Sequence, residues 1–403
     1  MLATGFAGPA NAAKKKTPPT TIPAKAKPVK VAGAPVVVGW ISQNGAGTQE
    51  ALLAEQFVNA NGGVSGRPLK LATCSTKGNA SSAKSCANQL LGKKVKLVLE
   101  GPADANWSAA AEVLRAANTL IVGRSPLSPA EYADPNAVYL APSAATVLAA
   151  TGVFVSTVDS ARAVAILVSS DSGSKAGLAL ALGPLRAKGL QPIVTTLTEG
   201  KGDETAIGAA FSAVTEAGVA AGGPSAMIVL ASPDQCIAVM EAAKTQAFTG
   251  RLITTDSCAT PATLEASGDN AEGWVVLSAR PNADAQAAFQ QFGDYVNAAT
   301  QFKIKRSTDP AAVQNFASVI SGISLVAKLE KSVLNATPAV VGATVKSYLG
   351  RAEATSTYAP KPYAYKRSKL FPAVAGFTVY ASQWSGGRFV EAPGGSKVDG
   401  FLG

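Results

Sequence analysis

The 403-residue chain contains no histidine. This absence excludes a Ser-His-Asp or Cys-His nucleophile, a histidine general base and a histidine-ligated zinc site. A glycine-rich loop of the Walker type is also missing, so nucleotide hydrolysis lacks its usual phosphate cradle. Carboxylates such as Asp104 and Asp256 could still act in an enzyme, but no nucleophile, base and orienting group can be assembled from the sequence. We therefore expect a protein that is not an enzyme and that uses no cofactor or metal.

Long apolar runs and aromatic residues are scarce as well. No uninterrupted run reaches the roughly 20 apolar residues that a bilayer crossing requires, so we expect no membrane-spanning helix. Aromatic residues make up 6% of the chain, whereas hydrophobic residues together make up 47%. A chain of this length and composition can bury a sizeable core and is expected to fold as two lobes rather than one.

The net charge of +10 suggests at first a nucleic-acid partner. Six lysines, however, lie in the Pro-rich leader, so the folded part is much less basic: Lys14, Lys15, Lys16, Lys25, Lys27 and Lys30. No basic helix or aromatic stacking platform accompanies the charge. We expect no nucleic-acid partner.

The first 35 residues read as a leader rather than as part of a fold. Met1 to Ala13 ends in Ala10-Asn11-Ala12-Ala13, which has the small-x-small form of a signal-peptidase site. We interpret it as the remnant of an export signal whose beginning lies upstream, with an ordinary disordered tail as the alternative. Lys14 to Pro35 is then an extended tether. This predicts a secreted protein of the cell envelope; the leader has no cysteine for a lipid anchor, and surface association stays open.

The four cysteines allow three pairings. Spacing favours Cys74 with Cys86 and Cys236 with Cys258, because each pair joins elements that are adjacent in the expected fold. Buried free thiols are the alternative. A four-cysteine metal site is disfavoured because no CxxC spacing is present.

Val36 to Ser75 contains a complete strand, loop, helix and strand. Val36 to Ile41 has the β-branched content of a buried parallel strand, Leu52, Leu53 and Phe57 recur at helical spacing, and Asn61-Gly62-Gly63 ends the helix. The pattern continues with strands at 69–74, 95–99, 120–122 and 138–141 and helices at 81–91 and 107–117. This predicts an α/β fold with a doubly wound parallel sheet.

A second cycle of strands and helices starts at Ala163. Strands are expected at 163–168, 191–198, 226–230, 252–255 and 273–278, and helices through Leu185 and at 207–217. Residues 283–299, 309–334 and 337–349 look helical and would rejoin the first lobe, and Phe371 to Phe389 is strand-like with a hairpin turn at Ser385 to Gly387. We therefore expect lobe 1 to comprise residues 36–145 and 279–370, and lobe 2 residues 146–278 and 371–403. A three-stranded hinge would cross near Ser143, Leu277 and Phe371.

The chain resembles the type I periplasmic substrate-binding proteins, the Leu/Ile/Val-binding-protein-like receptors of ABC importers. The resemblance is most specific at Asn61-Gly62-Gly63-Val64-Ser65-Gly66-Arg67-Pro68-Leu69, where the family has a near-identical N-x-G-G-I-x-G-R-x-L. Lys94 to Pro102 is similar to the family's third strand and its loop, and Ala165 to Gly177 to the opening of the second lobe. The similarity runs in order from about Val36 to about Tyr380.

In open parallel sheets, ligands bind beyond the carboxyl ends of the strands. In lobe 1 this predicts ligand contacts from the loops after strands one, three and four: Gln43, Asn44, Gly45, Asp104, Ala105, Asn106, Trp107 and Ser125. The helix starting near Trp107 would offer free N–H groups to a carboxylate. The resemblance implies Ser, Ala and Thr at 104–106, so Asp104 is a departure. The alternatives are Asp104 as a helix cap and Trp107 as a core residue. Arg124 either binds an acidic ligand or covers a strand end, and we favour the second interpretation.

In lobe 2 the resemblance implies that Asp256 and Ser257 lie where a carboxylate meets a ligand ammonium. Ser172 and Ser174 occupy a loop where the family offers an aromatic residue. Asp256 as a simple helix cap is the alternative.

The resemblance implies a monomeric receptor that traps a small-molecule ligand by hinge closure and delivers it to ABC permease subunits. An amino acid, an amide or a small carboxylate is the expected solute. A ligand-sensing domain for a signalling partner is the alternative.

Overall fold

The computed structural model describes residues 29–102, 106–126, 128–159, 161–198, 203–281, 289–307, 311–366, 368–369, 371–395 and 397–400. The expected signal remnant and most of the tether lie outside the described residues. The end of the tether does not hang free, because the amide of Ala32 donates to Gly66 and Arg67 Nε donates to the carbonyl of Ala34 at 2.7 Å. None of the described helices is long and apolar enough to span a membrane.

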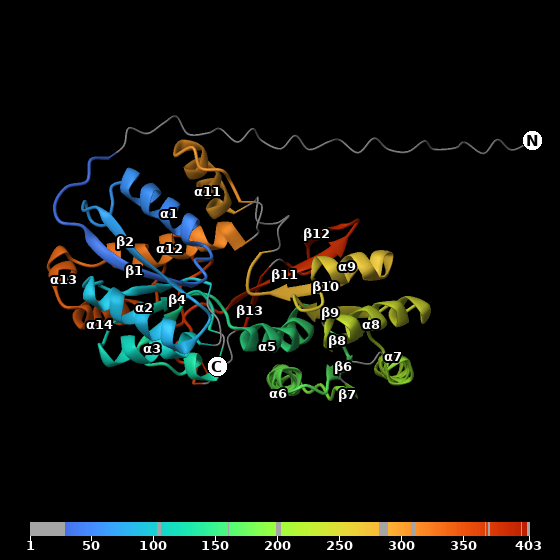
Figure 1. Ribbon diagram of the computed structural model, residues 1–403. Helices are drawn as coiled ribbons and strands as arrows, with labels where there is room; N and C mark the ends of the chain where they lie inside the picture. Colours follow the sequence, from blue (N-terminus) through green and yellow to red (C-terminus); the bar gives the residue numbers. More distant parts are fainter. Residues whose placement is uncertain are drawn as a thin grey trace, which may run out of the picture.

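The first body is built on a five-stranded parallel sheet in the order β2-β1-β3-β4-β5 (Figure 1). Its strands are β1 (Val36–Gln43), β2 (Leu69–Thr76), β3 (Val98–Glu100), β4 (Ile121–Gly123) and β5 (Ala137–Tyr139). Strands β1, β3, β4 and β5 are largely buried on both faces, whereas the edge strand β2 has exposed positions at Lys70 and Ser75.

Helices cover both faces of this sheet. One apolar cluster joins one face to α1 (Thr48–Ala60), α11 (Gln290–Gln301), α12 (Ala311–Ala327), α13 (Lys331–Asn335) and α14 (Pro338–Leu349). A second cluster joins the other face to α2 (Ala80–Gly92) and α3 (Trp107–Ala116), and a short α4 spans Pro129–Tyr132. The single helix expected over 309–334 is two helices, because Glu330 adopts an extended conformation at the start of α13.

The second body contains an eight-stranded mixed sheet. Strands β6 (Ala163–Ser169), β7 (Ile193–Leu197), β8 (Ser225–Leu230), β9 (Arg251–Thr255) and β10 (Val275–Ser278) are parallel. Strand β11 (Thr378–Ser385) pairs antiparallel with β10, β12 (Arg388–Glu391) and β13 (Lys397–Asp399). The second sheet therefore has a doubly wound parallel part, as expected, extended at one edge by antiparallel strands. The hairpin turn is confirmed, with Gly386 and Gly387 at positive φ.

Two layers of helices enclose the second sheet. Helices α5 (Ala144–Phe154), continued by a π turn at Val155–Asp159, and α6 (Ser172–Ala187) pack on one face. Helices α7 (Glu204–Ala221), α8 (Pro233–Thr245) and α9 (Pro261–Ser267), followed by a 3-10 turn at Gly268–Ala271, pack on the other. The two predicted disulfides, Cys74–Cys86 and Cys236–Cys258, are both present.

The chain passes between the bodies at three places. The first crossing leads from β5 to α5, which Ser143 caps through its hydroxyl, and the second leaves β10 at Ala279. Phe371 was expected to start the third, but 371–377 packs on the first sheet, where the amide of Ala375 donates to Tyr139. The third crossing therefore lies at Phe377, just before β11.

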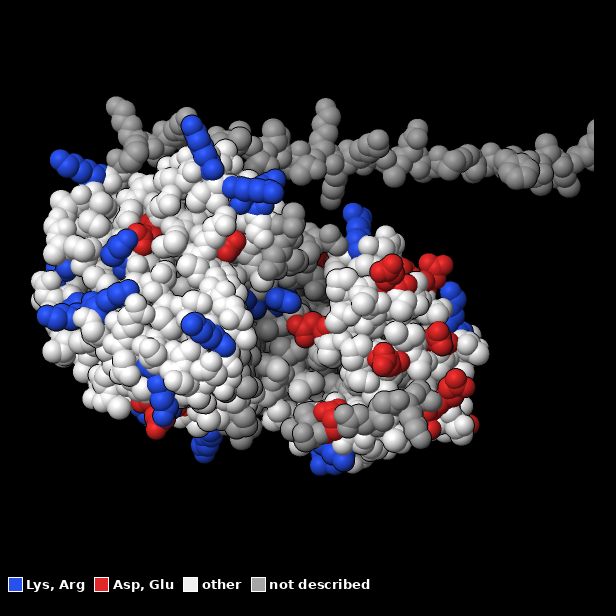
Figure 2. Space-filling view, in the orientation of Figure 1, with Lys and Arg blue, Asp and Glu red and all other residues white. Residues whose placement is uncertain are grey.

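Charge is distributed unequally between the bodies. Residues 29–141 and 281–377 contain 21 Lys and Arg against 12 Asp and Glu, whereas 142–280 and 378–403 contain 10 against 14. Figure 2 shows the basic side chains mainly over the first body and the acidic ones mainly over the second, with a recess between the two. The excess of positive charge thus belongs to the leader and the first body.

Candidate functional site

A cavity of about 320 Å³ lies where the first sheet meets the crossings. Its walls come from the carboxyl ends of β3, β4 and β5, from α12, from the segment 358–364 and from the crossing residues 279–281 and 375–380. Among them are Leu99, Glu100, Val122, Arg124, Arg280, Gln314, Tyr358 and Phe377. The volume is within the range of roughly 300–1,000 Å³ typical of small-molecule sites.

Glu100 forms part of the cavity wall at the end of β3 and is only 6% exposed. Burial raises the pKa of its carboxyl well above the usual value, the nearby Glu131 raises this pKa further, and a hydrogen bond with Tyr139 opposes the shift. Its Oε2 has no hydrogen-bond partner among the described residues. Burial therefore favours the neutral acid at this position.

Two arginines bring positive charge to the cavity. Arg124 follows β4 and is partly buried; burial and, to a smaller extent, the charge of Arg280 lower the pKa of its guanidinium to about 10, while Asp256 opposes the shift. Arg280 lies exposed at the mouth, where its Nη1 donates to Gln314 Oε1 at 3.4 Å. Within the described part of the chain, neither guanidinium has a carboxylate within 4.0 Å. Gln314 Nε2 is buried there without a hydrogen-bond partner.

Several other polar groups of the wall already have partners. Lys361 pairs with Asp399 at 2.8 Å, a contact that joins the two bodies. The Tyr358 hydroxyl donates to Asp294 at 2.8 Å, and the Tyr363 hydroxyl is 2.6 Å from that of Ser356. Burial raises the pKa of the Tyr358 and Tyr363 hydroxyls and raises that of Tyr380 to about 12, so these rings stay neutral. The cavity is thus mostly apolar and aromatic, and Arg124, Arg280 and Gln314 bring N–H donors to it.

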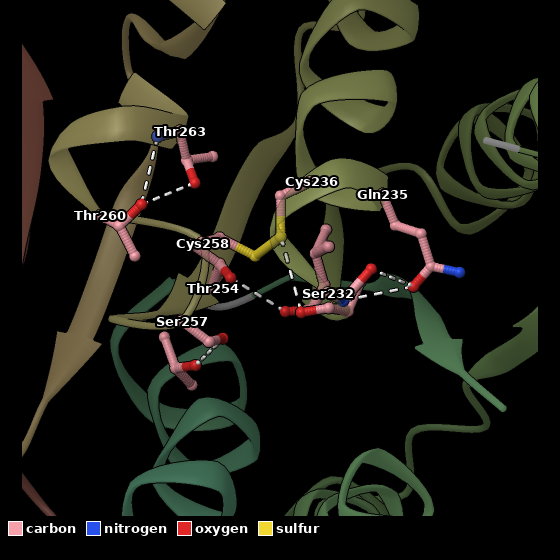
Figure 3. The surroundings of a disulfide bond; sticks show 11 residues. Ser232, Gln235, Cys236, Thr254, Ser257, Cys258, Thr260 and Thr263 are labelled. Atoms are coloured by element: carbon pink, nitrogen blue, oxygen red, sulfur yellow. Dashed lines mark hydrogen bonds between the residues drawn. A yellow bond between two sulfur atoms is a disulfide. The ribbon is translucent and has the colours of Figure 1, made fainter. Parts of the chain in front are cut away.

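The loops at the carboxyl ends of β8 and β9 are held by the second disulfide. Figure 3 shows Cys258 bonded to Cys236 at the start of α8, with Ser232 and Gln235 beside it. Gln235 Oε1 accepts from the amide and hydroxyl of Ser232, and its Nε2 donates to the carbonyl of Thr198 at 2.8 Å. These contacts fix the loop that carries Asp256, which accepts a hydrogen bond from Ser278 at 3.1 Å.

In the first body, none of the predicted ligand contacts that the structure describes lines this cavity. Gln43 ends β1, Asn44 adopts positive φ with its amide bonded to Thr76, and Gly45 also has positive φ. Asn106 Nδ2 donates to the carbonyl of Gly78, and Ser125 Oγ donates to that of Pro142 at the first crossing. Trp107 is 3% exposed in the core between α2 and α3 and offers no open ring face. Asp104 and Ala105 lie outside the described residues.

The predicted residues of the second body also lie apart from the cavity. Asp256 and Ser257 are exposed after β9, and the Ser257 hydroxyl is 2.9 Å from that of Thr255. Ser172 starts α6, where only its backbone is described, and the Ser174 amide donates to Asp171, which caps that helix. Asp256 does not cap α9, because Thr260 does.

The cavity residues Glu100, Arg280 and Gln314 were not predicted. Glu100 had a sequence signal, since it is the one acid in the apolar run 97–102 and ends a strand. Arg280 likewise follows a strand directly. Gln314 had no such signal in the sequence, because only tertiary packing brings α12 to the strand ends.

Comparison with known proteins agrees with this architecture. A family model described as periplasmic binding protein matches residues 28–347. The chain belongs to the periplasmic binding protein family. Its members are non-enzymatic, extracytoplasmic solute-binding proteins of ABC transporters, which confirms the expectation that the chain is not an enzyme. No curated protein matches the sequence.

Solved structures of this family share the type I fold at low sequence identity. A putative branched-chain amino acid ABC transporter protein from Rhodospirillum rubrum matches with a TM-score of 0.71 and 12% identity over 88% of this chain and 99% of that one. An ABC transporter substrate-binding protein from Desulfitobacterium hafniense, in complex with Leu, gives 0.61 and 16% over 89% and 99%. A fatty acid ABC transporter substrate-binding protein from Thermomonospora curvata gives 0.57 and 15% over 93% and 93%. The predicted periplasmic binding protein type I fold is confirmed.

Proposed function

We propose that this chain is a monomeric extracytoplasmic receptor that captures a small polar solute, an amino acid, an amide or a small carboxylate, and delivers the closed form to an ABC permease. The observation that carries the proposal is the position of the cavity, which lies at the crossings and takes wall residues from both bodies. A solute that contacts both bodies only when they approach favours the closed state by that difference in affinity. The predicted loop residues Gln43, Asn44, Gly45, Asp256 and Ser257 would then close over the solute.

A solute panel tests this function. The full chain is screened by thermal shift against amino acids, their amides and small carboxylates, and hits are measured by calorimetry. Small-angle scattering with and without a hit should show a smaller radius of gyration when the solute is bound. A chain that binds no solute, or that binds one without becoming more compact, would contradict the receptor function.

A further inference from the structure

The charges around the cavity do not balance. Lys361 is paired with Asp399, and burial disfavours a charge on Glu100 by raising the pKa of its carboxyl. Arg124 and Arg280 remain, close enough for each to disfavour the charge of the other, and Asp256 is the acid near Arg124. Among the described residues near Arg124, two cations and one carboxylate leave one positive charge.

The hydrogen-bonding groups of the cavity also favour an anion, because they include N–H donors without a carboxylate partner in the part of the chain that the structure describes. The Arg124 guanidinium has no carboxylate within 4.0 Å among the described residues, and Gln314 Nε2 is a buried donor without a partner there. Buried donors are normally satisfied by a partner, and a planar guanidinium matches the two oxygens of a carboxylate. The remainder of the wall is apolar, with Leu99, Val122 and Phe377 among its residues.

On the basis of the receptor function proposed above, we propose that the cavity takes an organic monoanion with an apolar body. Its carboxylate lies between Arg124 and Arg280 beside the amide of Gln314, and its apolar part lies against Leu99, Val122 and Phe377. A monoanion completes the charge balance, whereas a dianion would exceed it.

The same distribution of charges disfavours free amino acids as ligands of the cavity. An ammonium group in the cavity needs a carboxylate, but Asp399 is paired with Lys361, and burial raises the pKa of Glu100 and so disfavours its charged form. Asp256 is not part of the cavity wall; when it closes over the solute it already offsets the charge of Arg124, so it is not free to pair with an ammonium group. Burying an unpaired ammonium costs more than burying a methylene in its place.

Three matched ligands test the proposal by calorimetry on the full chain at one pH and ionic strength. These are 4-methylpentanoate, its neutral primary amide and leucine, which differs from the first only by its ammonium group; phenylacetate and its amide form a second pair. We expect each carboxylate to bind at least about tenfold more tightly than its amide, and 4-methylpentanoate about tenfold more tightly than leucine.

Variants of the two arginines test whether these residues cause the preference for carboxylates. Arg280→Gln and Arg124→Gln should each weaken carboxylate binding about tenfold or more, and Arg280→Lys, which keeps the charge but loses the planar fork, should restore only part of it. Lys305→Gln removes one exposed positive charge on the first body and should change affinity less than about twofold. Circular dichroism verifies folding; because Arg280 is exposed, its variants decide the outcome if Arg124→Gln does not fold.

Equal binding of acid and amide, or carboxylate affinity unchanged in Arg280→Gln, would overturn the proposal. Tight binding of leucine without binding of the carboxylates would overturn it while leaving the receptor function in place. If none of these ligands binds, the anion proposal fails, and the receptor function fails with it only if the wider solute panel also gives no hit.

Discussion

Replacing Glu100 by glutamine should remove a pH dependence from the stability of the fold. Glu100 is 6% exposed, its Oε2 has no partner among the described residues, and burial and Glu131 raise the pKa of its carboxyl well above 4.5. A carboxyl whose folded-state pKa is raised stabilises the fold below the unfolded-chain value, and that contribution is lost as the pH rises to the folded-state pKa. Within this window the folded chain holds one more proton, so the free energy of unfolding falls by about 1.4 kcal/mol per pH unit.

The assay is urea unfolding followed by tryptophan fluorescence at half-unit steps from pH 5 to pH 8. The wild type should lose stability with rising pH, whereas Glu100→Gln should be flatter and more stable at the upper end. Glu353→Gln, which replaces an exposed carboxyl group, should keep the slope of the wild type. A variant with the same slope as the wild type, or one that is less stable at pH 8, would refute the idea that Glu100 is a buried neutral acid.

Three further predictions concern packing and cross-links. Gly376→Ala places a methyl group against the backbone of Leu140 at the third crossing and should cost about 1–3 kcal/mol in urea unfolding, whereas Gly183→Ala in α6, with open space around it, should be neutral or stabilising. Replacing Trp107 by alanine should cost about 3–5 kcal/mol without a specific loss of ligand affinity, since the side chain is core; a folded variant that loses only binding would contradict this. The double variant Cys236→Ser, Cys258→Ser should be less stable than the oxidised wild type by about 3 kcal/mol, and no loss under oxidising conditions would contradict a stabilising cross-link.

The sequence was sufficient for most of the fold because the signals are local. The first strand, helix and second strand were predicted to within two residues at most ends, since the β-branched run from Val36 and the stop at Asn61-Gly62-Gly63 act over a few residues. The break between α12 and α13 was missed, because an apolar pattern continues across Leu329, which remains buried in the core. Strand β13 has one buried residue, Val398, in an edge position, and so leaves almost no alternating pattern to detect.

The cavity residues were harder to predict than the fold, because they come together only through tertiary packing. The strand-end rule selected the correct edge of the first sheet but not the cavity residues there. Glu100 and Gln314 are 214 positions apart, and their shared cavity depends on how α12 packs across Leu99 through the small residue Gly322. Arg124 was interpreted as a strand-end cover because the sequence does not show that Arg280, which follows β10 in the second body, lines the same cavity.

The positions of the two arginines relate ligand charge to the hinge. Arg124 follows β4 in the first body, and Arg280 begins the crossing that leaves β10 in the second. Their repulsion opposes any movement that brings the ends of β4 and β10 together, while Asp256 offsets only part of it. A monoanion between them turns that repulsion into attraction, and its effect grows as the separation shrinks. A neutral isostere fills the same space without this effect, so it should leave the two bodies further apart than the carboxylate does, even at saturating concentration.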